Sequence, residues 1–306
     1  MPELPEVEAV RRALRPVVEG ARFDKVVARR RDLRVAFPAR FTTRLEGQTV
    51  RTLGRRGKYL LAELSSRDVL VMHLGMSGSF RVEQGRMTAT PGRFHDDRSA
   101  AVPHDHVVFW MSSGATVTFN DPRRFGYMDL IAMDDLAAHP VVGGLGPEPL
   151  SQDFTPFSLA RSCRGKRTSL KAALLDQRVV AGLGNIYVSE ALYRARLSPR
   201  RRASTIATRS GAPRDTAGQL TRAIKDTLND AIRRSESWQT QRGEGDESAY
   251  FPNRFRVYDR EGARCRTRGC PGLIRRIVQV GRSTFYCAVC QKYVGTETRK
   301  HGNTER

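Results

Sequence analysis

The chain opens Met1-Pro2-Glu3-Leu4-Pro5-Glu6-Val7-Glu8-Ala9-Val10, and this stretch predicts that the fold starts with a helix buried on one face. Proline fits the first turn of a helix, and acidic side chains there complement the helix dipole. We expect this helix to end near Pro16 to Gly20. Apolar residues recur at spacings of three or four, the period of an amphipathic helix: Leu4, Val7, Val10, Leu14 and Val17.

The same opening also suggests chemistry at the N-terminus. If the initiator Met1 is removed, Pro2 becomes a terminal secondary amine, and α-amino groups titrate close enough to neutral pH to act as nucleophiles. Such an amine can add to a sugar C1′, and the resulting iminium promotes elimination of phosphate. Glu3 is placed to move protons during that addition. A plain helix start remains open, and both interpretations can hold together.

Composition indicates a polyanionic partner. Among 306 residues, 53 Lys and Arg against 32 Asp and Glu give a net charge of +21, which favours DNA, RNA or an anionic membrane. Membrane is the least favoured, because no stretch approaches the roughly 18 to 20 apolar residues of a spanning helix. The acidic opening is no secretory signal, and an odd number of cysteines argues against a disulfide framework. We expect a soluble, cytoplasmic protein.

Short strands followed by helices organise the chain. The strands predict an antiparallel sandwich or barrel, with a loop over 85–103 and a Gly/Pro-rich joint over 143–149. A helical region follows, and 236–254 is predicted as a polar loop. The predicted strands are 25–29, 50–53, 58–64, 69–74, 79–82, 107–111, 116–119 and 127–132, and the predicted helices are 157–163, 170–175, 186–195 and 216–235.

Four cysteines near the C-terminus have the spacing of a metal site. Cys265-x4-Cys270 and Cys287-x2-Cys290 lie around a predicted hairpin, and four thiolates suit one structural zinc ion, with free buried thiols as the alternative. Cys163 is left over and is expected to be a core residue. Arginines on the hairpin could reach a phosphate or groove, or could form a solvated basic surface: Arg275, Arg276 and Arg282.

Taken together, these motifs resemble the formamidopyrimidine-DNA glycosylase family over nearly the whole chain. The resemblance rests on residues 2–8, 56–59, 73–78, 104–106, 121–126 and 184–190 and on the cysteine cluster. It implies an α+β multidomain fold with an N-terminal antiparallel β-sandwich and a leading helix, a helix-two-turn-helix domain, and a C-terminal β-hairpin zinc finger. The implied ranges are 1–135 for the catalytic sandwich, 136–152 for a linker, 153–250 for the helical domain, 251–295 for the finger and 296–306 for a tail.

The resemblance implies a monomeric, bifunctional enzyme acting on damaged double-stranded DNA. It would flip a damaged purine out of the duplex, cut the glycosidic bond through a Schiff base on Pro2, and break the strand by β,δ-elimination. Glu3 would protonate the departing sugar-ring oxygen. Lys58 would donate a proton in β-elimination, and Arg282 would assist δ-elimination. In isolation, Lys58 is typical of an exposed strand lysine.

Further positions match the family's DNA contacts. The resemblance assigns phosphate and DNA contacts to His104, Arg123, Lys166 and Asn185, and a wedge that fills the gap left by the flipped nucleotide to Met76, Arg123 and Phe125. An apolar plug offsets part of the unstacking energy, a few kcal/mol. Without the motifs, His104 would be a loop histidine, Asn185 a turn or cap residue, and Met76 and Phe125 core residues.

Two features depart from the family pattern. The first cysteine pair has four intervening residues where the family usually has two, and the loop 235–249 lacks the glycine-rich sequence with which the family recognises the everted base. An endonuclease VIII-like glycosylase for oxidised pyrimidines, or mainly an abasic-site lyase, therefore stays open, although Leu4 favours the purine enzyme. A non-catalytic zinc protein that binds DNA is a third alternative.

Overall fold

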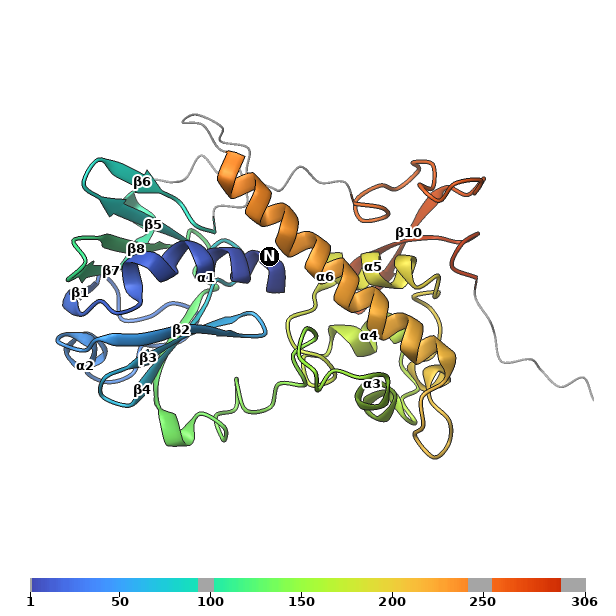
Figure 1. Cartoon of the computed structure of the whole chain (residues 1–306), viewed down its shortest axis with the longest axis horizontal. Helices are drawn as coiled ribbons and strands as arrows, with labels where there is room; N and C mark the ends of the chain where they lie inside the picture. Colours follow the sequence, from blue (N-terminus) through green and yellow to red (C-terminus); the bar gives the residue numbers. More distant parts are fainter. Residues whose placement is uncertain (1, 93–101, 242–254, 293–306) are drawn as a thin grey trace, which may run out of the picture. The chain divides into compact units, whose positions relative to one another are not determined.

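The computed structural model describes residues 2–92, 102–241 and 255–292 (Figure 1). The chain divides into two compact units. The sandwich unit comprises Met1–Ser151, Val180–Leu183 and Leu228–Asn253, and the helical unit comprises Gln152–Val179, Gly184–Thr227 and Arg254–Arg306. The finer domain boundaries given above remain predictions. Within the described residues, no helix has the length and apolar character needed to cross a membrane.

Two antiparallel sheets enclose the core of the sandwich unit. One has the strand order β1-β7-β8-β5-β6 and the other β2-β3-β4-β9. The strands are β1 (Phe23–Ala28), β2 (Val50–Arg56), β3 (Tyr59–Leu64), β4 (Asp68–His73), β5 (Ser79–Gln84), β6 (Met87–Ala89), β7 (Asp105–Met111), β8 (Thr116–Asn120) and β9 (Tyr127–Ala132). This confirms the predicted sandwich.

The leading helix α1 (Leu4–Val18) lies between the two sheets in Figure 1. Its predicted apolar face is buried, and Val7, Val10 and Leu14 join the same hydrophobic cluster as the inward side chains of both sheets. Fully burying such an aliphatic side chain contributes about 1.5 to 3 kcal/mol. The helix is therefore held by the core, and the position of its first residue is determined by that packing.

The structure corrects two predictions in this unit. The expected loop 85–103 contains β6, which pairs with β5 through Val82 and Ala89, and residues 93–101 lie outside the described residues. A short helix, α2 (Phe41–Leu45), was also missed. Phe41 and Leu45 are buried in the core, but five residues are too few to give a recognisable helical period.

The helical unit contains α3 (Pro156–Cys163), α4 (Leu170–Leu175), α5 (Asn185–Arg194) and the first part of α6 (Asp215–Gln241). Thr155 begins α3 by accepting a hydrogen bond from the Ser158 amide at 3.1 Å, as an N-cap should. A hairpin of β10 (Ile274–Gln279) and β11 (Arg282–Cys287) completes the unit. The helical region and the C-terminal hairpin are thus confirmed.

Helix α6 is longer than the sequence predicted. The predicted helix 216–235 is confirmed, but the helix continues to Gln241, so the predicted loop 236–254 is wrong over its first six positions. The remainder of that loop, 242–254, lies outside the described residues. Residues 236–241 contain no glycine or proline, so nothing in their backbone preferences ends the helix there.

Candidate functional site

The start of α1 is buried and tightly held. Pro2 is buried, and Glu3 is 2% exposed and donates its backbone N–H to Glu6 Oε2 at 2.9 Å. The Leu4 amide donates to the Gly182 carbonyl at 3.1 Å. Gly182 has φ +83°, and a Cβ there would lie 2.6 Å from Leu4 Cδ1. Only glycine allows this approach, so the Gly182 loop fixes the position of Pro2 and Glu3.

Lys58 lies in the turn between β2 and β3, next to the same loop. Its side chain is 7% exposed, so the interpretation as an exposed strand lysine is wrong. Gly57 has φ +57°, and a Cβ at that position would lie 3.4 Å from both Ala181 Cβ and Gly182 N. The loop at 181–182 therefore contacts both the start of α1 and the turn that carries Lys58.

His73, at the end of β4, pairs with Tyr59, the residue after Lys58, and the centroids of the two rings lie 4.8 Å apart. Burial, followed by the positive charges of Lys58 and Arg34, lowers the pKa of His73 to about 4, so the imidazole is neutral at physiological pH. Its Nδ1 accepts a hydrogen bond from the Gly75 amide at 2.9 Å. Sequence reasoning included His73 in a motif but gave it no role. The structure places it beside Tyr59 of β3 and bonds it to the turn that carries Met76.

Met76, Arg123 and Phe125 are brought together on the surface of the sandwich unit. Met76 is 37% and Phe125 43% exposed, so neither is the core residue that isolated reasoning expects. The Arg123 guanidinium lies 4.8 Å from the Phe125 ring centroid. A Cβ at Gly75 would lie 2.4 Å from the Phe125 carbonyl carbon, so the two turns pack backbone against backbone. This arrangement fits the predicted wedge.

His104 is tied to the same turns through Asp121. The His104 carbonyl accepts the Asp121 amide at 3.0 Å. The Asp121 carboxylate is fully buried and accepts hydrogen bonds from Ser77 Oγ at 2.6 Å and from the Gly126 amide at 2.7 Å. Packing therefore leads from the start of α1 through the Gly182 loop to the Gly57–Lys58 turn. Strand pairing of Tyr59 with His73 leads on from that turn to the wedge turns and His104.

In the helical unit, Asn185 contacts Ser283, the residue that follows Arg282 in the chain. Asn185 begins α5, and its Nδ2 donates to the Ser283 carbonyl at 2.9 Å, whereas its Oδ1 is buried and has no hydrogen-bond partner in the described part of the chain. Arg282 is exposed at the first position of β11. Lys171 of α4 is completely buried, with Nζ donating to the Ser283 carbonyl at 2.9 Å and to Thr284 Oγ1 at 2.6 Å. Sequence reasoning missed Lys171.

Lys166 lies after α3 in the helical unit and is half-buried. Its backbone N–H donates to the Cys163 carbonyl at 3.1 Å. Cys163 itself is fully buried, and burial raises the pKa of its thiol to about 11. That is the environment of a core residue, as predicted.

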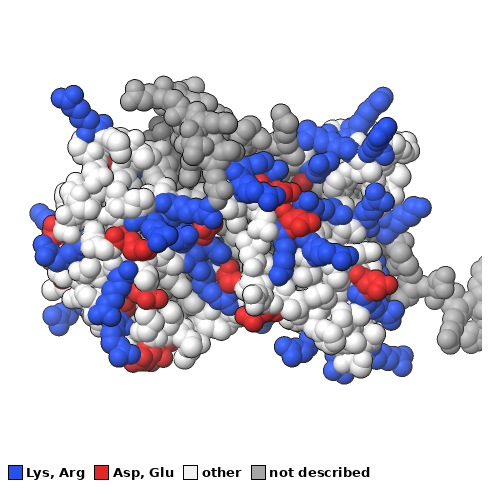
Figure 2. Space-filling view, viewed as in Figure 1, with Lys and Arg blue, Asp and Glu red and all other residues white. Residues whose placement is uncertain are grey.

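Figure 2 shows Lys and Arg side chains spread over the visible face, with fewer Asp and Glu between them.

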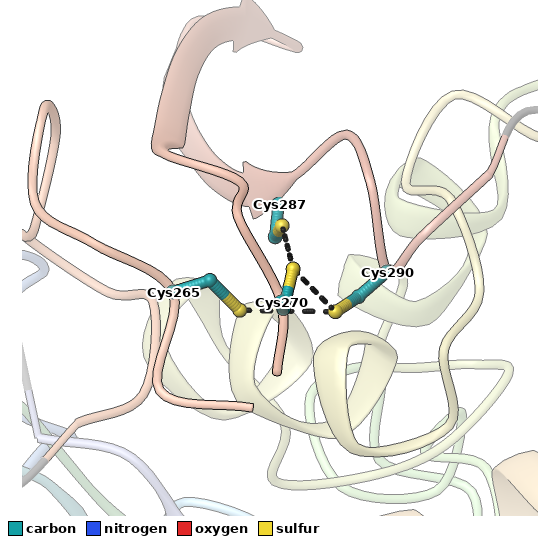
Figure 3. A group of neighbouring side chains, drawn as sticks. All are labelled: Cys265, Cys270, Cys287 and Cys290. Atoms are coloured by element: carbon teal, nitrogen blue, oxygen red, sulfur yellow. Dashed lines mark hydrogen bonds between the residues drawn. The ribbon is translucent and has the colours of Figure 1, made fainter. Parts of the chain in front are cut away.

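The four cysteines converge on one point (Figure 3). Their sulfur atoms all lie within 4.8 Å of one another, and the Sγ–Sγ distances are 3.7 Å for Cys265–Cys290, 3.8 Å for Cys270–Cys287 and 3.3 Å for Cys270–Cys290. Four sulfurs at about 2.3 Å from a tetrahedral ion lie about 3.8 Å apart, so the donor set and its spacing fit such an ion. The extra residues between the first pair remove no ligand.

Helix α5 supports the cysteine-bearing segment. Tyr193 Oη lies 3.2 Å from Cys265 Sγ. The buried Glu190 carboxylate accepts three backbone amides, from Arg256 at 2.8 Å, Val257 at 2.8 Å and Tyr258 at 2.9 Å. These contacts join the segment that leads into the hairpin to the helix that begins with Asn185.

The structure has the three features that the motif resemblance implied for a DNA glycosylase with abasic-site lyase activity. They are a helix-led antiparallel sandwich, a buried Pro2-Glu3 pair and a four-cysteine hairpin. Models of the formamidopyrimidine-DNA glycosylase N-terminal domain and H2TH domain match residues 1–128 and 145–242. The chain belongs to the formamidopyrimidine-DNA glycosylase family.

Relatives and solved structures agree with this assignment. The formamidopyrimidine-DNA glycosylase of Rhodopseudomonas palustris strain HaA2 is 61% identical over 292 residues, covering 95% of this chain and all of the relative. The MutM (Fpg) protein of Thermus thermophilus is 37% identical with a TM-score of 0.74, covering 95% of this chain and 98% of its own. The Lactococcus lactis enzyme bound to abasic-site DNA is 29% identical with a TM-score of 0.76, covering 95% and 100%. The predicted family and enzyme class are confirmed, and the non-catalytic alternative is wrong.

Proposed function

We propose that this enzyme removes oxidised purines, such as 8-oxoguanine and formamidopyrimidines, from damaged double-stranded DNA and then nicks the strand. Complexes of the Lactococcus lactis relative with Fapy-dG DNA and with abasic-site DNA support this substrate class. The observation that carries the proposal is the series of packed turns and paired strands in the sandwich unit. It joins the buried start of α1 to Lys58 and then to the exposed Met76 and Phe125.

In the proposed mechanism, the Pro2 amine, free once Met1 is removed, bonds to C1′ of the damaged nucleotide as the bond from C1′ to the base breaks. Glu3 protonates the sugar-ring oxygen, which opens the ring and leaves an iminium. Loss of a C2′ proton then breaks the bond to the 3′ phosphate, with Lys58 donating a proton. Arg282 assists the second elimination, at the 5′ phosphate. Burial of Pro2 and Glu3 reduces competition from water.

The DNA contacts are proposed for both units. His104 and Arg123 would contact phosphate or base from the sandwich unit, and Lys166 and Asn185 would do so from the helical unit. Met76 and Phe125 would fill the gap left by the extruded nucleotide, since exposed apolar side chains gain most by entering a base stack. The net charge of +21 supports phosphate binding along the duplex. We propose that the enzyme acts as a monomer in the cytoplasm, bound to the chromosome.

For the cysteine cluster we propose one zinc ion held by Cys265, Cys270, Cys287 and Cys290. The sulfur spacing and the closed set of four thiolates support a structural ion, because no position is left open for water. When bound, the ion supplies a cross-link that stabilises the hairpin. The hairpin itself places Arg282 at the first position of β11.

Borohydride reduction tests the proposal. Purified enzyme is reduced on duplexes that contain 8-oxoguanine, a formamidopyrimidine, an oxidised pyrimidine or an abasic site. The oxidised pyrimidine is included because the Lactococcus lactis relative has also been found with such DNA. We expect trapping on both purine lesions and on the abasic site, with the peptide adduct at Pro2. An adduct at an internal lysine would reject the mechanism, and trapping on the pyrimidine alone would reject the substrate class.

A further inference from the structure

Glu148 lies in the Gly/Pro-rich joint 143–149, to which the proposed function gives no role. The sequence around it is Gly146-Pro147-Glu148-Pro149, so prolines on both sides restrict the backbone. The Pro147 carbonyl accepts the Ala181 amide at 3.1 Å, which ties the joint to the loop that contacts α1. Glu148 is therefore a carboxylate on a rigid, anchored piece of backbone.

The Glu148 carboxylate binds three consecutive residues before Lys58. Oε2 accepts a hydrogen bond from Arg55 Nη1 at 2.9 Å, and Oε1 accepts one from Arg56 Nη1 at 3.1 Å and another from the Gly57 backbone N–H. Arg56 also donates to the Leu145 carbonyl at 2.8 Å. The Glu148 side chain is 21% exposed and that of Arg55 11%, so solvent screens these charge-assisted bonds only partly.

Arg55 connects this group to the helix that carries Pro2 and Glu3. Its Nε donates to Glu8 Oε2 of α1 at 3.2 Å, and its Nη1 donates to the Gly57 carbonyl at 2.9 Å as well as to Glu148. One guanidinium thus bridges a carboxylate on α1 and a carboxylate on the joint. Both peptide groups of Gly57 are held, its N–H by Glu148 and its C=O by Arg55.

The conformation of Gly57, which glycine adopts without steric cost, is what these hydrogen bonds hold. Its φ of +57° is in the left-handed region, and the next residue is Lys58. The φ and ψ of Gly57 determine the direction in which the Lys58 side chain leaves the turn, so a carboxylate that fixes both sides of Gly57 fixes that direction. A displacement of about 1 Å at a catalytic group can reduce a rate a hundredfold.

We propose that Glu148 is a positioning residue for Lys58, holding the turn at Gly57 in register with the start of α1 through Arg55. The inference rests on the proposed role of Lys58 in strand scission. Glu148 touches neither substrate nor reacting atoms in this scheme. Its effect is confined to the step that Lys58 serves.

The test is a double-mutant cycle in single-turnover assays on a duplex with a preformed abasic site. The variants are Glu148→Gln, Lys58→Gln and both together, and two rates are followed: formation of the borohydride-trappable imine and strand scission. Glu19→Gln is the matched control, because Glu19 also accepts a backbone amide of β2, from Leu53 at 3.0 Å, together with an arginine, Arg15 at 3.2 Å. Glu148→Asp keeps the charge.

We expect Glu148→Gln to slow scission about tenfold or more while imine formation changes less than about threefold. Glu19→Gln should stay within about twofold of the parent, and Glu148→Asp should recover part of the loss. The double variant should be no slower than Lys58→Gln alone, since the two residues act in one unit. If Glu148→Gln slowed scission by the same factor in the Lys58→Gln variant as in the parent enzyme, Glu148 would act independently of Lys58. Its role would then be merely structural and the inference wrong.

The two possible failures are distinguishable. If Lys58→Gln leaves scission unchanged, the proposed role of Lys58 is wrong. If Lys58→Gln slows scission but Glu148→Gln behaves like Glu19→Gln, only the inference about Glu148 is overturned. Thermal unfolding of each variant accompanies the kinetics, and if Glu148→Gln does not fold, Glu148→Asp carries the cycle with the same expected pattern at smaller size.

Discussion

Glu190→Gln is expected to release the segment that leads into the cysteine hairpin. In the native chain one oxygen of Glu190 accepts the Val257 and Tyr258 amides, and the other accepts the Arg256 amide. Glutamine keeps the first oxygen but replaces the second with an NH₂ group, which faces the N–H of Arg256 as donor against donor. One bond is lost, and the other two lose their charge assistance.

The expected size follows from these three bonds. An unsatisfied buried N–H costs about 1 to 3 kcal/mol, so we expect the local opening free energy at 256–258 to fall by about 2 kcal/mol. That corresponds to about thirtyfold faster amide hydrogen exchange at these positions. Exchange measured by mass spectrometry on the zinc-loaded protein provides the assay. The control is Glu261→Gln, whose ion pair with Arg276 at 3.7 Å is exposed and worth little.

Two results would refute this reasoning. If exchange at residues 256–258 rises less than about threefold, the carboxylate does not hold the segment. If exchange rises equally in β2 and β3 of the sandwich unit, the substitution destabilises the chain globally and the local argument is wrong. Protection in β10 and β11 should fall together with that at 256–258, because Val257 packs in one cluster with Ile274 of β10 and Phe285 of β11.

Further outcomes are expected at other positions. Gly182→Ala should reduce borohydride trapping more than tenfold, because its Cβ would meet Leu4 at 2.6 Å, whereas Gly20→Ala, at φ +82° with nothing within 4 Å, carries similar strain of about 1 to 2 kcal/mol and should trap normally. Burial raises the pKa of Glu8, but hydrogen bonds from two arginines of its helix outweigh it and lower the pKa to about 2. The resulting stabilisation, up to about 3 kcal/mol, is therefore present above pH 4.5 and lost as the pH falls towards 2; urea titrations of Glu8→Gln should lack this loss. DNA affinity should fall about a thousandfold or more between 50 and 200 mM salt if at least six phosphates are contacted, and a flat response in a binding titration would contradict that. Chelation of zinc should abolish tight DNA binding before the sandwich unfolds by circular dichroism, and undiminished incision after chelation would count against Arg282.

Local patterns predicted those parts of the chain whose structure depends on local physics. The apolar period of α1 and the alternation of the strands follow from the repeating geometry of helices and strands. The cysteine spacing follows from two short turns that each carry two ligands. Lys58 and Lys171 carry no such signal. The Nζ of buried Lys171 donates hydrogen bonds to Ser283 and Thr284, more than a hundred residues later in the chain. Burial of a lysine is decided by partners distant in sequence, and no window around it contains them.

For the wedge residues, local reasoning made the opposite error, because it predicted burial where the structure shows exposure. Met76 and Phe125 are apolar and lie beside strands, so local reasoning places them in the core, yet both are exposed. The cause is the turn geometry: Gly75 lets the two turns touch through their backbones, which leaves the side chains pointing outward. Only the motif resemblance predicted this outcome. Exposing large apolar side chains is unfavourable for the isolated protein, which is why a local rule cannot anticipate it.

Acidic side chains are buried more often than Lys and Arg side chains in the described part of the chain, which the net charge alone does not show. Among the described residues, the buried carboxylates accept hydrogen bonds from backbone amides or from neighbouring side chains, whereas the buried Lys and Arg side chains are those of Lys58 and Lys171. Burial of these acids leaves the exposed residues of the described chain rich in Lys and Arg, which favours phosphate attraction. Three of these carboxylates, of Glu6, Asp121 and Glu190, also accept backbone amides and so hold the chain around proposed site residues within each unit. The buried acids are Glu3, Glu6, Glu8, Asp105, Asp121 and Glu190.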